Sequence, residues 1–305
     1  MMSAAAWMNG KFIDYQTMAV PVWDLGVVAG ASITEMARTY QHRPSRLELH
    51  LDRLVSSCRE LKFDLPYSRH ELLSAAQEVV ARNTANLPLH SDLGVVMFVT
   101  GGANQTYLGS QPLPTATVGI HSFELPFHLW KNAATTGIRL VTTSIRQHDQ
   151  QNVPVHLKIR NRLHWWLADQ QAHEIQAGSK ALLLDAEERI TETSTSAFYA
   201  VIDGSIVTPQ VNVLESLSRQ MVSEAAAAAG LAFECRDLWI DDLRAATECF
   251  GSSTPVGILP IASVNDQTFP VATPTSVIAE LLDYWQTQTG VNPREQLLHS
   301  ESTGS

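Results

Sequence analysis

The chain has 305 residues, of which 45% are apolar, and it carries a formal net charge of −10 at pH 7. This length suits two modest domains or one large domain with a sizeable core. The acidic balance argues against non-specific binding of nucleic acid, which requires a basic face to displace phosphate counterions. Because no run of roughly 18 apolar residues is present, the sequence also predicts no membrane span.

Cysteine and histidine usage bears on the compartment and on metals. Cys58, Cys235 and Cys249 are an odd number at wide spacings, which is neither a disulfide framework nor a zinc pattern. The histidines also lack the spacing of a metal site, so we expect no metal. The apolar start of the chain lacks the basic segment of a signal peptide. These features favour a cytoplasmic protein.

Hydrophobic periodicity predicts strands and helices through the first part of the chain. Asn9-Gly10, flanked by apolar residues, predicts a β-hairpin over residues 6–15. Apolar residues at helical spacing predict a helix over residues 51–61, which Pro66 terminates. The other elements expected here are a strand over 31–40, a helix over 69–83, and strands over 95–100 and 115–120.

A mixed segment rich in aromatic residues and proline is expected to connect two domains. We therefore expect an N-terminal α/β domain over 1–122, an interdomain connection over 123–135, a C-terminal domain over 136–288 and a disordered polar tail over 289–305. The elements expected in the C-terminal domain are a strand over 137–144, a helix over 160–176, a strand over 181–185, a hairpin over 198–209 and a helix over 216–229, which Gly230 stops.

Lys158 and Glu192 are the residues that indicate chemistry. They lie on either side of a predicted helix and an apolar strand, an order that could place them on opposite sides of a ligand. A lysine beside apolar residues can form a Schiff base with a carbonyl compound. A carboxylate opposite it can keep a ring nitrogen protonated. Combined with a phosphate site, the pair indicates pyridoxal phosphate.

Three segments offer groups for a phosphate. Leu217 and Ser218 open an alanine-rich helix, whose first N–H groups and positive dipole end favour an anion. Arg53 has no carboxylate at the neighbouring helical positions, so its guanidinium could grip a phosphate. Ser253-Thr254 form a small-residue turn that can present N–H and O–H groups. The structural alternatives are an N-capping serine, a solvated arginine and an ordinary loop.

The sequence lacks several common catalytic signatures, including G-x-x-x-x-G-K-[ST], H-E-x-x-H, C-x-x-C and G-x-S-x-G. It instead resembles the class IV aminotransferases of pyridoxal-phosphate fold type IV, in segments that follow the family's order. G-A-S-I-T-E-M-A-R from Gly30 resembles the early strand of the family. H-L-D-R-L from His50 resembles its H-x-x-R-L helix, and K-I-R-N-R-L from Lys158 resembles its Schiff-base lysine segment.

Later segments extend this resemblance to about residues 7–265. The stretch from Asp185 to Phe198 resembles the D-x-x-G-x-[VI]-x-E-x-x-x-x-N-[FL] signature, with Ala197 in place of the asparagine. Thr208-Pro209 with Leu214 and Ser218-Arg219 resembles T-P…L-x-G-[IV]-[ST]-R, and E-C-F from Glu248 resembles the E-[VC]-F motif that precedes a small-residue turn.

The resemblance implies an α+β fold with a smaller N-terminal α/β domain and a larger C-terminal domain that has a barrel-like sheet and helices. It implies that Lys158 carries pyridoxal phosphate and shuttles a proton, while Glu192 pairs with the pyridine nitrogen. The phosphate would be held by residues from the three segments above, namely Arg53, Leu217, Ser218, Ser253 and Thr254. It further implies a homodimer and ping-pong kinetics.

Substrate choice depends on departures from the family patterns. Branched-chain enzymes carry G-N-Y after the lysine, whereas this chain has Asn161-Arg162-Leu163. This spacing is closer to that of D-amino-acid aminotransferases and aminodeoxychorismate lyases. Met36 replaces the threonine of the lyases, which argues against a lyase. Glu35 and Arg38 match the E-x-x-R of branched-chain enzymes.

The loop over residues 101–108 lacks the arginine and histidine that bind the substrate carboxylate in D-amino-acid enzymes. Arg38, Tyr107 and Arg146 are candidate replacements. The prediction is a transaminase for amino acids and 2-oxo acids, branched-chain-like in preference. The alternatives are an aminodeoxychorismate lyase, a D-amino-acid or (R)-amine transaminase, and a cofactor-binding protein without turnover.

Overall fold

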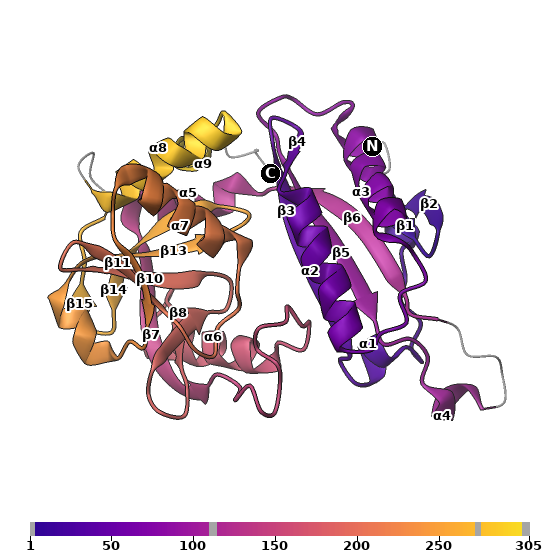
Figure 1. Ribbon diagram of the computed structural model, residues 1–305, viewed down its shortest axis with the longest axis horizontal. Coiled ribbons are helices and arrows are strands. Elements are labelled where there is room, and N and C mark those ends of the chain that lie inside the picture. The colour runs from indigo at the N-terminus through magenta and orange to yellow at the C-terminus, as the bar shows by residue number, and fades with distance from the viewer. Residues whose placement is uncertain (1–3, 110–114, 272–275, 301–305) are drawn as a thin grey trace. The chain divides into compact units, whose positions relative to one another are not determined.

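The computed structural model describes residues 4–109, 115–271 and 276–300, and the chain divides into two compact units (Figure 1). Unit 1 contains the chain up to Leu125 together with Leu157–Asn161. Unit 2 contains Pro126–His156 and the chain from Arg162 onward. Lys158 was expected in the C-terminal domain, but the segment that carries it packs with unit 1. Among the described residues, no helix has the length and apolar character needed to cross a membrane.

Unit 1 is built on an antiparallel sheet with the strand order β2-β1-β6-β5-β3-β4. Its strands are β1 (Ala5–Met8), β2 (Lys11–Asp14), β3 (Ser32–Tyr40), β4 (Arg43–Ser45), β5 (Leu93–Thr100) and β6 (Val118–Glu124). The predicted hairpin at Asn9-Gly10 is confirmed, and both turn residues have positive φ, +48° and +87°, as a two-residue turn of this kind requires. Strand β6 begins three residues later than expected.

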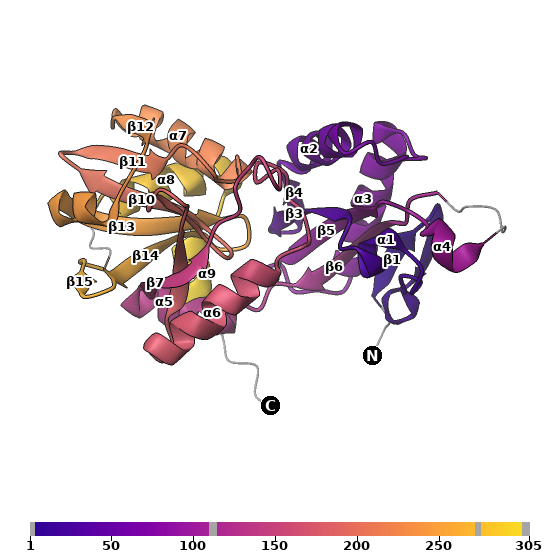
Figure 2. The same cartoon turned by 90° about the horizontal axis from the view of Figure 1, so that it is seen from below.

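Two helices, α2 (Leu47–Glu60) and α3 (Arg69–Thr84), cover one face of this sheet (Figure 2). Leu47, Leu51, Leu54 and Cys58 recur every three or four residues in α2 and are buried, so they form one apolar stripe against the sheet. A capping box begins α3: the Ser68 side chain accepts from the Glu71 N–H and the Glu71 carboxylate accepts from the Ser68 N–H. The shorter elements are η1 (Tyr15–Thr17), α1 (Leu25–Val28) and α4 (Gln105–Leu108).

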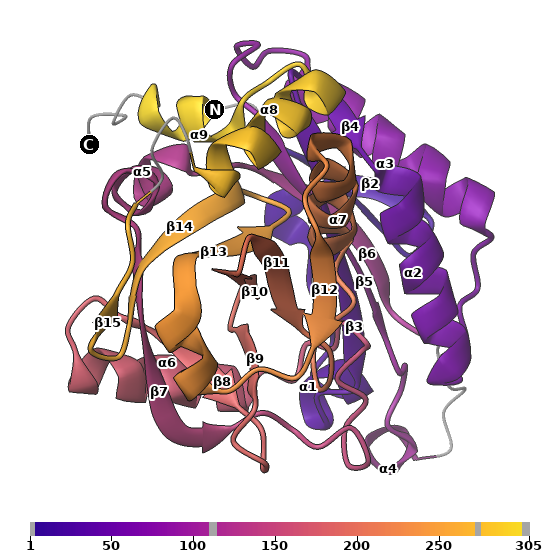
Figure 3. The ribbon, with the colours of Figure 1, turned by 60° about the vertical axis from the view of Figure 1, so that its left-hand side comes forward.

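Unit 2 contains a closed barrel of six strands in the order β10-β13-β14-β7-β8-β9, which the pairing of Glu192 in β9 with Ala197 in β10 completes (Figure 3). The barrel strands are β7 (Ile138–Arg146), β8 (Lys180–Leu184), β9 (Ile190–Thr193), β10 (Ala197–Ile202), β13 (Ala246–Ser253) and β14 (Gly257–Val264). Three further strands, β11 (Ser205–Pro209), β12 (Phe233–Arg236) and β15 (Gln267–Thr268), extend the sheet. The barrel-like sheet expected from the resemblance is therefore confirmed.

Alternate residues of the barrel strands fill its interior, among them Leu140, Leu182, Phe198, Cys249 and Ile261, which are all buried. The helices of unit 2 are α5 (Phe127–Thr136), α6 (Leu163–Ile175), η2 (Ile240–Ala245), α7 (Leu217–Ala229), α8 (Val277–Thr289) and α9 (Pro293–Leu298). Helix α6 packs on the outside of β7 and β8, and α7 packs against β12 and β13. Gly230 ends α7 in the left-handed conformation, as predicted.

Two expected segments are structured differently. The proposed connection over 123–135 is largely helix α5, which buries Phe127 and Ala134. The tail over 289–305 was expected to be disordered, but it contains α9, because Asn292 caps the helix, Pro293 occupies its first turn and Leu297 is buried. Residues 301–305 of that tail lie outside the described residues.

Candidate active site

Lys158 lies in a short extended segment that pairs with β3. The Thr34 N–H donates to the Lys158 carbonyl at 2.9 Å, the Arg160 N–H donates to the Ser32 carbonyl at 2.9 Å, and Ile159 forms an antiparallel bridge with Ile33. Ile159 also packs against the core of unit 1. Because side chains alternate along an extended segment, Lys158 and Arg160 point away from the face that Ile159 occupies. The backbone on both sides of the lysine is thus fixed by the sheet.

Glu35 in β3 and two residues of α2 form a buried charged cluster beside this segment. The Glu35 carboxylate accepts from the Arg53 guanidinium twice, at 2.5 and 2.8 Å, and it lies 2.7 Å from His50 Nδ1. Glu35 is 1% exposed, whereas the Arg53 side chain is 18% exposed. The sequence indicated no intrahelical partner for Arg53. In the structure its partner is Glu35 of the neighbouring strand β3, and this pairing fixes the direction of the Arg53 guanidinium.

Burial and hydrogen bonding set the charges of this cluster. Burial raises the pKa of Glu35, but the hydrogen bonds from His50 and Arg53 outweigh it, so the pKa is lowered and the carboxylate is ionised. Burial lowers the pKa of His50, and the positive charges of Arg53 and Lys158 add to that effect. The cluster therefore holds one carboxylate, one guanidinium and a neutral imidazole at pH 7.

The three residues suggested as substrate contacts have different surroundings. Arg38 is 1% exposed, pairs with Asp92 at 3.4 Å and donates to the Thr39 carbonyl. Arg146 lies on the surface of unit 2, where it pairs with Glu188 at 2.6 Å. Tyr107, in α4, is 64% exposed. The substrate roles of Arg38, Arg146 and Tyr107 stay predictions.

A β-bulge determines where Glu192 points. Leu184 pairs with Ile190 and Leu182 pairs with Thr193, so two residues of β9, Thr191 and Glu192, lie opposite one residue of β8. Without this extra residue, Glu192 would share the parity of Ile190 and face the barrel interior. The bulge instead turns it to the outer face, in register with Ala197 of β10. The sequence pattern around Glu192 did not reveal this change of side.

The partners of Glu192 favour an ionised carboxylate. Its Oε1 accepts from the Leu214 N–H at 3.2 Å and from Gln147 Nε2 at 3.4 Å. Gln147 Oε1 in turn lies 3.0 Å from His164 Nε2. Burial lowers the pKa of His164 to about 4, with smaller contributions from His148 and Arg162, so this histidine is neutral and its Nε2–H donates to Gln147. This chain of hydrogen bonds orients the amide toward the carboxylate.

The start of α7 and the end of β13 carry the other groups suggested for a phosphate. Ser216 caps α7, and its hydroxyl lies 3.0 Å from the buried hydroxyl of Ser218. Leu217 and Ser218 are the first two residues of the helix, where backbone N–H groups have no intrahelical acceptor. In β13, Ser252 is 2.9 Å from the hydroxyl of the fully buried Tyr199, and Ser253 precedes the turn at Thr254.

Strand register relates the carboxylate to these hydroxyls. Ala197 of β10 is the lateral neighbour of Glu192 on one side and of Ser252 on the other, so the two residues lie on the same outer face two strand spacings apart, or about 10 Å. A ligand with an anionic group at one end and a basic ring nitrogen at the other can lie between these hydroxyls and the Glu192 carboxylate. The donors of unit 2 therefore fit the phosphate and pyridine nitrogen of pyridoxal phosphate.

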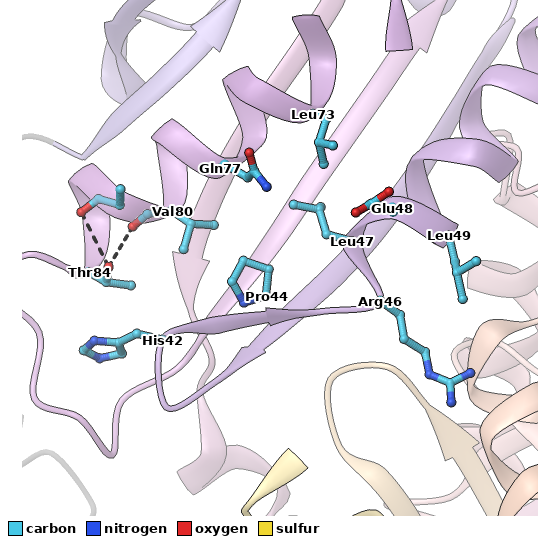
Figure 4. Close-up of a pocket in the computed structure, with 11 residues that line it drawn as sticks. His42, Pro44, Arg46, Leu47, Glu48, Leu49, Leu73, Gln77, Val80 and Thr84 are labelled. Atoms are coloured by element: carbon cyan, nitrogen blue, oxygen red, sulfur yellow. Dashed lines mark hydrogen bonds between the residues drawn. The ribbon is translucent and has the colours of Figure 1, made fainter. Parts of the chain in front are cut away.

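A separate pocket of about 440 Å³ lies in unit 1 between β4 and the helices α2 and α3 (Figure 4). Its lining mixes apolar side chains such as Pro44, Leu47 and Val80 with Arg46 and Glu48. None of the residues suggested by the sequence lines it. Within the described ranges, no group of three or more His, Cys, Asp or Glu side chains is placed to hold a metal ion.

Comparisons with known proteins agree with this geometry. The chain matches the family described as amino-transferase class IV over residues 32–264. A Methanocaldococcus jannaschii protein assigned to the branched-chain-amino-acid aminotransferases is 28% identical, covering 85% of this chain and 87% of that protein. The D-alanine aminotransferase of Bacillus licheniformis is 27% identical, covering 87% and 90%.

A solved structure of a branched-chain amino acid aminotransferase with pyridoxamine 5'-phosphate, from the organism abbreviated T.th., has a TM-score of 0.83, 26% identity and 95% coverage of both chains. The family match spans most of the chain, and the relatives are similar over nearly their whole lengths. The chain therefore belongs to the class IV aminotransferases, which depend on pyridoxal phosphate.

Proposed function

We propose that this aminotransferase transfers the amino group of a branched-chain-like amino acid to a 2-oxo acid, with pyridoxal phosphate carried on Lys158 and its ring nitrogen held by Glu192. The observation that carries the assignment is the bulge in β9, which turns Glu192 onto the face that it shares with Ser252. The Leu214 N–H and the Gln147 amide both donate to Glu192, which offsets the partial burial of its carboxylate.

When bound, pyridoxal phosphate acts as an electron sink for the bond that breaks at the substrate α-carbon. The Glu192 carboxylate holds a proton at the pyridine nitrogen, and the Leu214 N–H and Gln147 amide keep it ionised and oriented. Once the substrate amine had displaced it from the cofactor, the freed Lys158 amine would hold and move the proton of the substrate α-carbon. Because the backbone of Lys158 pairs with β3, the amine can move only by rotation about the bonds of its side chain.

The first N–H groups of α7 at Leu217 and Ser218, the Ser218 hydroxyl, and Ser253 and Thr254 at the end of β13 would hold the phosphate. Arg53 contributes its guanidinium from α2, in the direction that Glu35 imposes. These contacts keep the phosphate end fixed while the reacting end exchanges partners.

The preference for branched-chain-like substrates is supported by the E-x-x-R sequence at Glu35 and Arg38 and by relatives named as branched-chain aminotransferases. Relatives named as D-alanine aminotransferases are nearly as similar, so transfer from D-alanine is the second candidate. Met36, at the position of the lyase threonine, disfavours an aminodeoxychorismate lyase. We also propose a homodimer, as in the family, and a cytoplasmic location, which suits three cysteines that are all free.

A panel of half-reactions tests the assignment. The holoenzyme is mixed with L-leucine, D-alanine, L-glutamate or (R)-1-phenylethylamine, and loss of the visible absorbance of the bound cofactor is followed in time. L-Leucine is expected to react fastest, with release of the corresponding 2-oxo acid. D-Alanine reacting fastest would move the assignment to the second candidate, and no reaction with any donor would refute a transaminase. Production of pyruvate from aminodeoxychorismate alone would identify a lyase.

A further inference from the structure

Arg160 differs from the other arginines near the candidate site because no carboxylate neutralises it. Arg38 pairs with Asp92 and Arg53 pairs with Glu35. Arg162 donates to the Ser194 carbonyl at 2.6 Å and has Glu192 and Asp169 near it. Among the described residues, Arg160 forms no ion pair, and its guanidinium contacts Phe98 and Thr34. A guanidinium in that setting is suited to an anion that arrives from outside the chain.

The surroundings of Arg160 hold its side chain on one face of the unit 1 sheet. Its guanidinium lies over the ring of Phe98, 4.9 Å from the centroid, and Nη2 donates to the Thr34 hydroxyl at 3.3 Å. Thr34 and Phe98 are directly paired in β3 and β5. The neighbouring residues Ile33 and Val99 belong to the core under α2 and α3, so Thr34 and Phe98 face the opposite side of the sheet.

Gly119 makes the aromatic part of this arrangement feasible. It pairs with Phe98 in β6, and a Cβ atom there would collide with the Phe98 ring and the Met18 methyl group. The glycine therefore lets the ring lie across β6, where it forms a platform for the guanidinium. Phe98 is 7% exposed, so the ring is fixed by packing, whereas Arg160 itself stays accessible to solvent.

His121 adds an unsatisfied polar group to the same face. It pairs with Val96 in the row beside Phe98 and Gly119, and its Nδ1 is buried without a hydrogen-bond partner among the described residues. Burial and, to a smaller extent, the charge of Arg160 lower its pKa to about 4, so His121 is neutral. Partial burial of the guanidinium likewise lowers the pKa of Arg160, although the residue as a whole is exposed.

Arg160 is also placed beside the reactive amine. It follows Lys158 by two residues in an extended segment, so both side chains leave the backbone on the same side, with Cα atoms about 7 Å apart. A ligand that brings its α-carbon to the Lys158 amine therefore brings its carboxylate within reach of a long arginine side chain.

We propose that Arg160, supported by Thr34 and Phe98, binds a carboxylate of the amino-acid or 2-oxo-acid substrate and so selects carboxylate-bearing donors over simple amines. The inference rests on the proposed function, and it replaces Arg38 as the arginine that recognises the substrate. Arg160 is a binding residue in this assignment and takes no part in proton transfer.

Binding of unreactive probes to the holoenzyme tests this inference directly. 4-Methylpentanoate, glutarate and the neutral 4-methylpentanamide are titrated by calorimetry against the wild type, Arg160→Gln and the control Arg59→Gln, which removes an exposed arginine at the end of α2. Arg160→Gln should weaken binding of the carboxylates about 10- to 100-fold, as expected for a lost charge-assisted hydrogen bond, and leave the amide unchanged. Arg59→Gln should change none of them.

The two carboxylate probes distinguish which end of the substrate is bound. If Arg160 holds the carboxylate next to the reacting carbon, both probes lose affinity by a similar factor. If it holds a distal carboxylate, only glutarate does. If each probe binds Arg160→Gln as tightly as it binds the wild type, the inference is overturned. If that variant does not fold, Arg160→Lys serves instead, because a single ammonium cannot reproduce the two planar N–H donors of the guanidinium. Binding of the carboxylate probes should weaken several-fold, and unchanged binding would contradict the inference.

A half-reaction with (R)-1-phenylethylamine, which has no carboxylate, separates this inference from the proposed function. The KM for L-leucine should rise in Arg160→Gln by a larger factor than the KM for this amine, and equal factors would contradict the inference. If the wild type reacts with no donor, the proposed function fails. If it reacts normally but the variant binds carboxylates as tightly, only the role of Arg160 fails.

Discussion

The Glu35–Arg53 pair permits a quantitative prediction, because its two members differ in burial. Glu35 is 1% exposed and Arg53 retains 18% exposure of its side chain. Removing one member of a buried pair costs about 3–5 kcal/mol, largely because the other charge is left without a partner. Arg53→Leu leaves the more buried charge, so it should cost about 4–5 kcal/mol, whereas Glu35→Leu should cost about 3 kcal/mol.

The double variant Glu35→Leu/Arg53→Leu removes both charges and should be less destabilised than the sum of the single variants by about 2–3 kcal/mol. Because the chain has two units, a single melting temperature would mix their contributions. We would therefore measure apoprotein unfolding in urea together with peptide-resolved amide hydrogen exchange over β3 and α2. Additive costs, or a cost below about 1 kcal/mol for each single variant, would show that the pair is not energetically coupled.

Three other variants or conditions test separate parts of the structure. Burial lowers the pKa of His50, and it lowers the pKa values of His121 and His164 to about 4, so the unfolded chain binds more protons below the ordinary pKa of 6.5. For His121 and His164 the free energy of unfolding should therefore fall between pH 6.5 and about 4, by at most about 1.4 kcal/mol per pH unit for each histidine. Urea titrations that are independent of pH in this range would contradict this prediction. Ser218→Ala should weaken cofactor binding about 10- to 100-fold in a fluorescence titration, while Ser223→Ala, one turn further along α7, should not; equal effects would argue against a phosphate contact at Ser218. Gly119→Ala should destabilise unit 1 by about 1–3 kcal/mol because the new methyl group meets Phe98 and Met18, whereas Gly101→Ala, which has ordinary contacts at 3.5 Å, should be tolerated; similar urea midpoints for the two would refute the packing argument.

Local patterns were sufficient for much of the fold. The Asn9-Gly10 turn, the apolar stripe of α2 and the glycine after α7 each act within a few residues, so the sequence predicted these elements. The tail was misjudged because its average composition is polar, while the short Asn292-Pro293 start signal and the buried Leu297 determine α9. Average composition cannot describe a helix of that length, whose stability comes from packing against other helices.

The candidate site could be predicted only in part, because several of its features depend on residues that are distant in the chain. The motifs indicated Lys158, Glu192 and Ser218, but the partner of Arg53 comes from β3, and no helical spacing could reveal it. The side on which Glu192 lies depends on a bulge in the pairing of β9 with β8. The uncompensated charge of Arg160 likewise depends on which carboxylates the fold brings near other arginines.

The attachment point of the cofactor is the most direct test of the account. The chain has five lysines, Lys11, Lys62, Lys131, Lys158 and Lys180, so the assignment can be made by peptide mapping. The holoenzyme is reduced with borohydride, which fixes the cofactor to the amine that carries it, and is then digested and analysed by mass spectrometry. The account predicts the added mass on the peptide that contains Lys158 and on no other. Attachment to another lysine, or no attachment in a protein that transaminates, would contradict it.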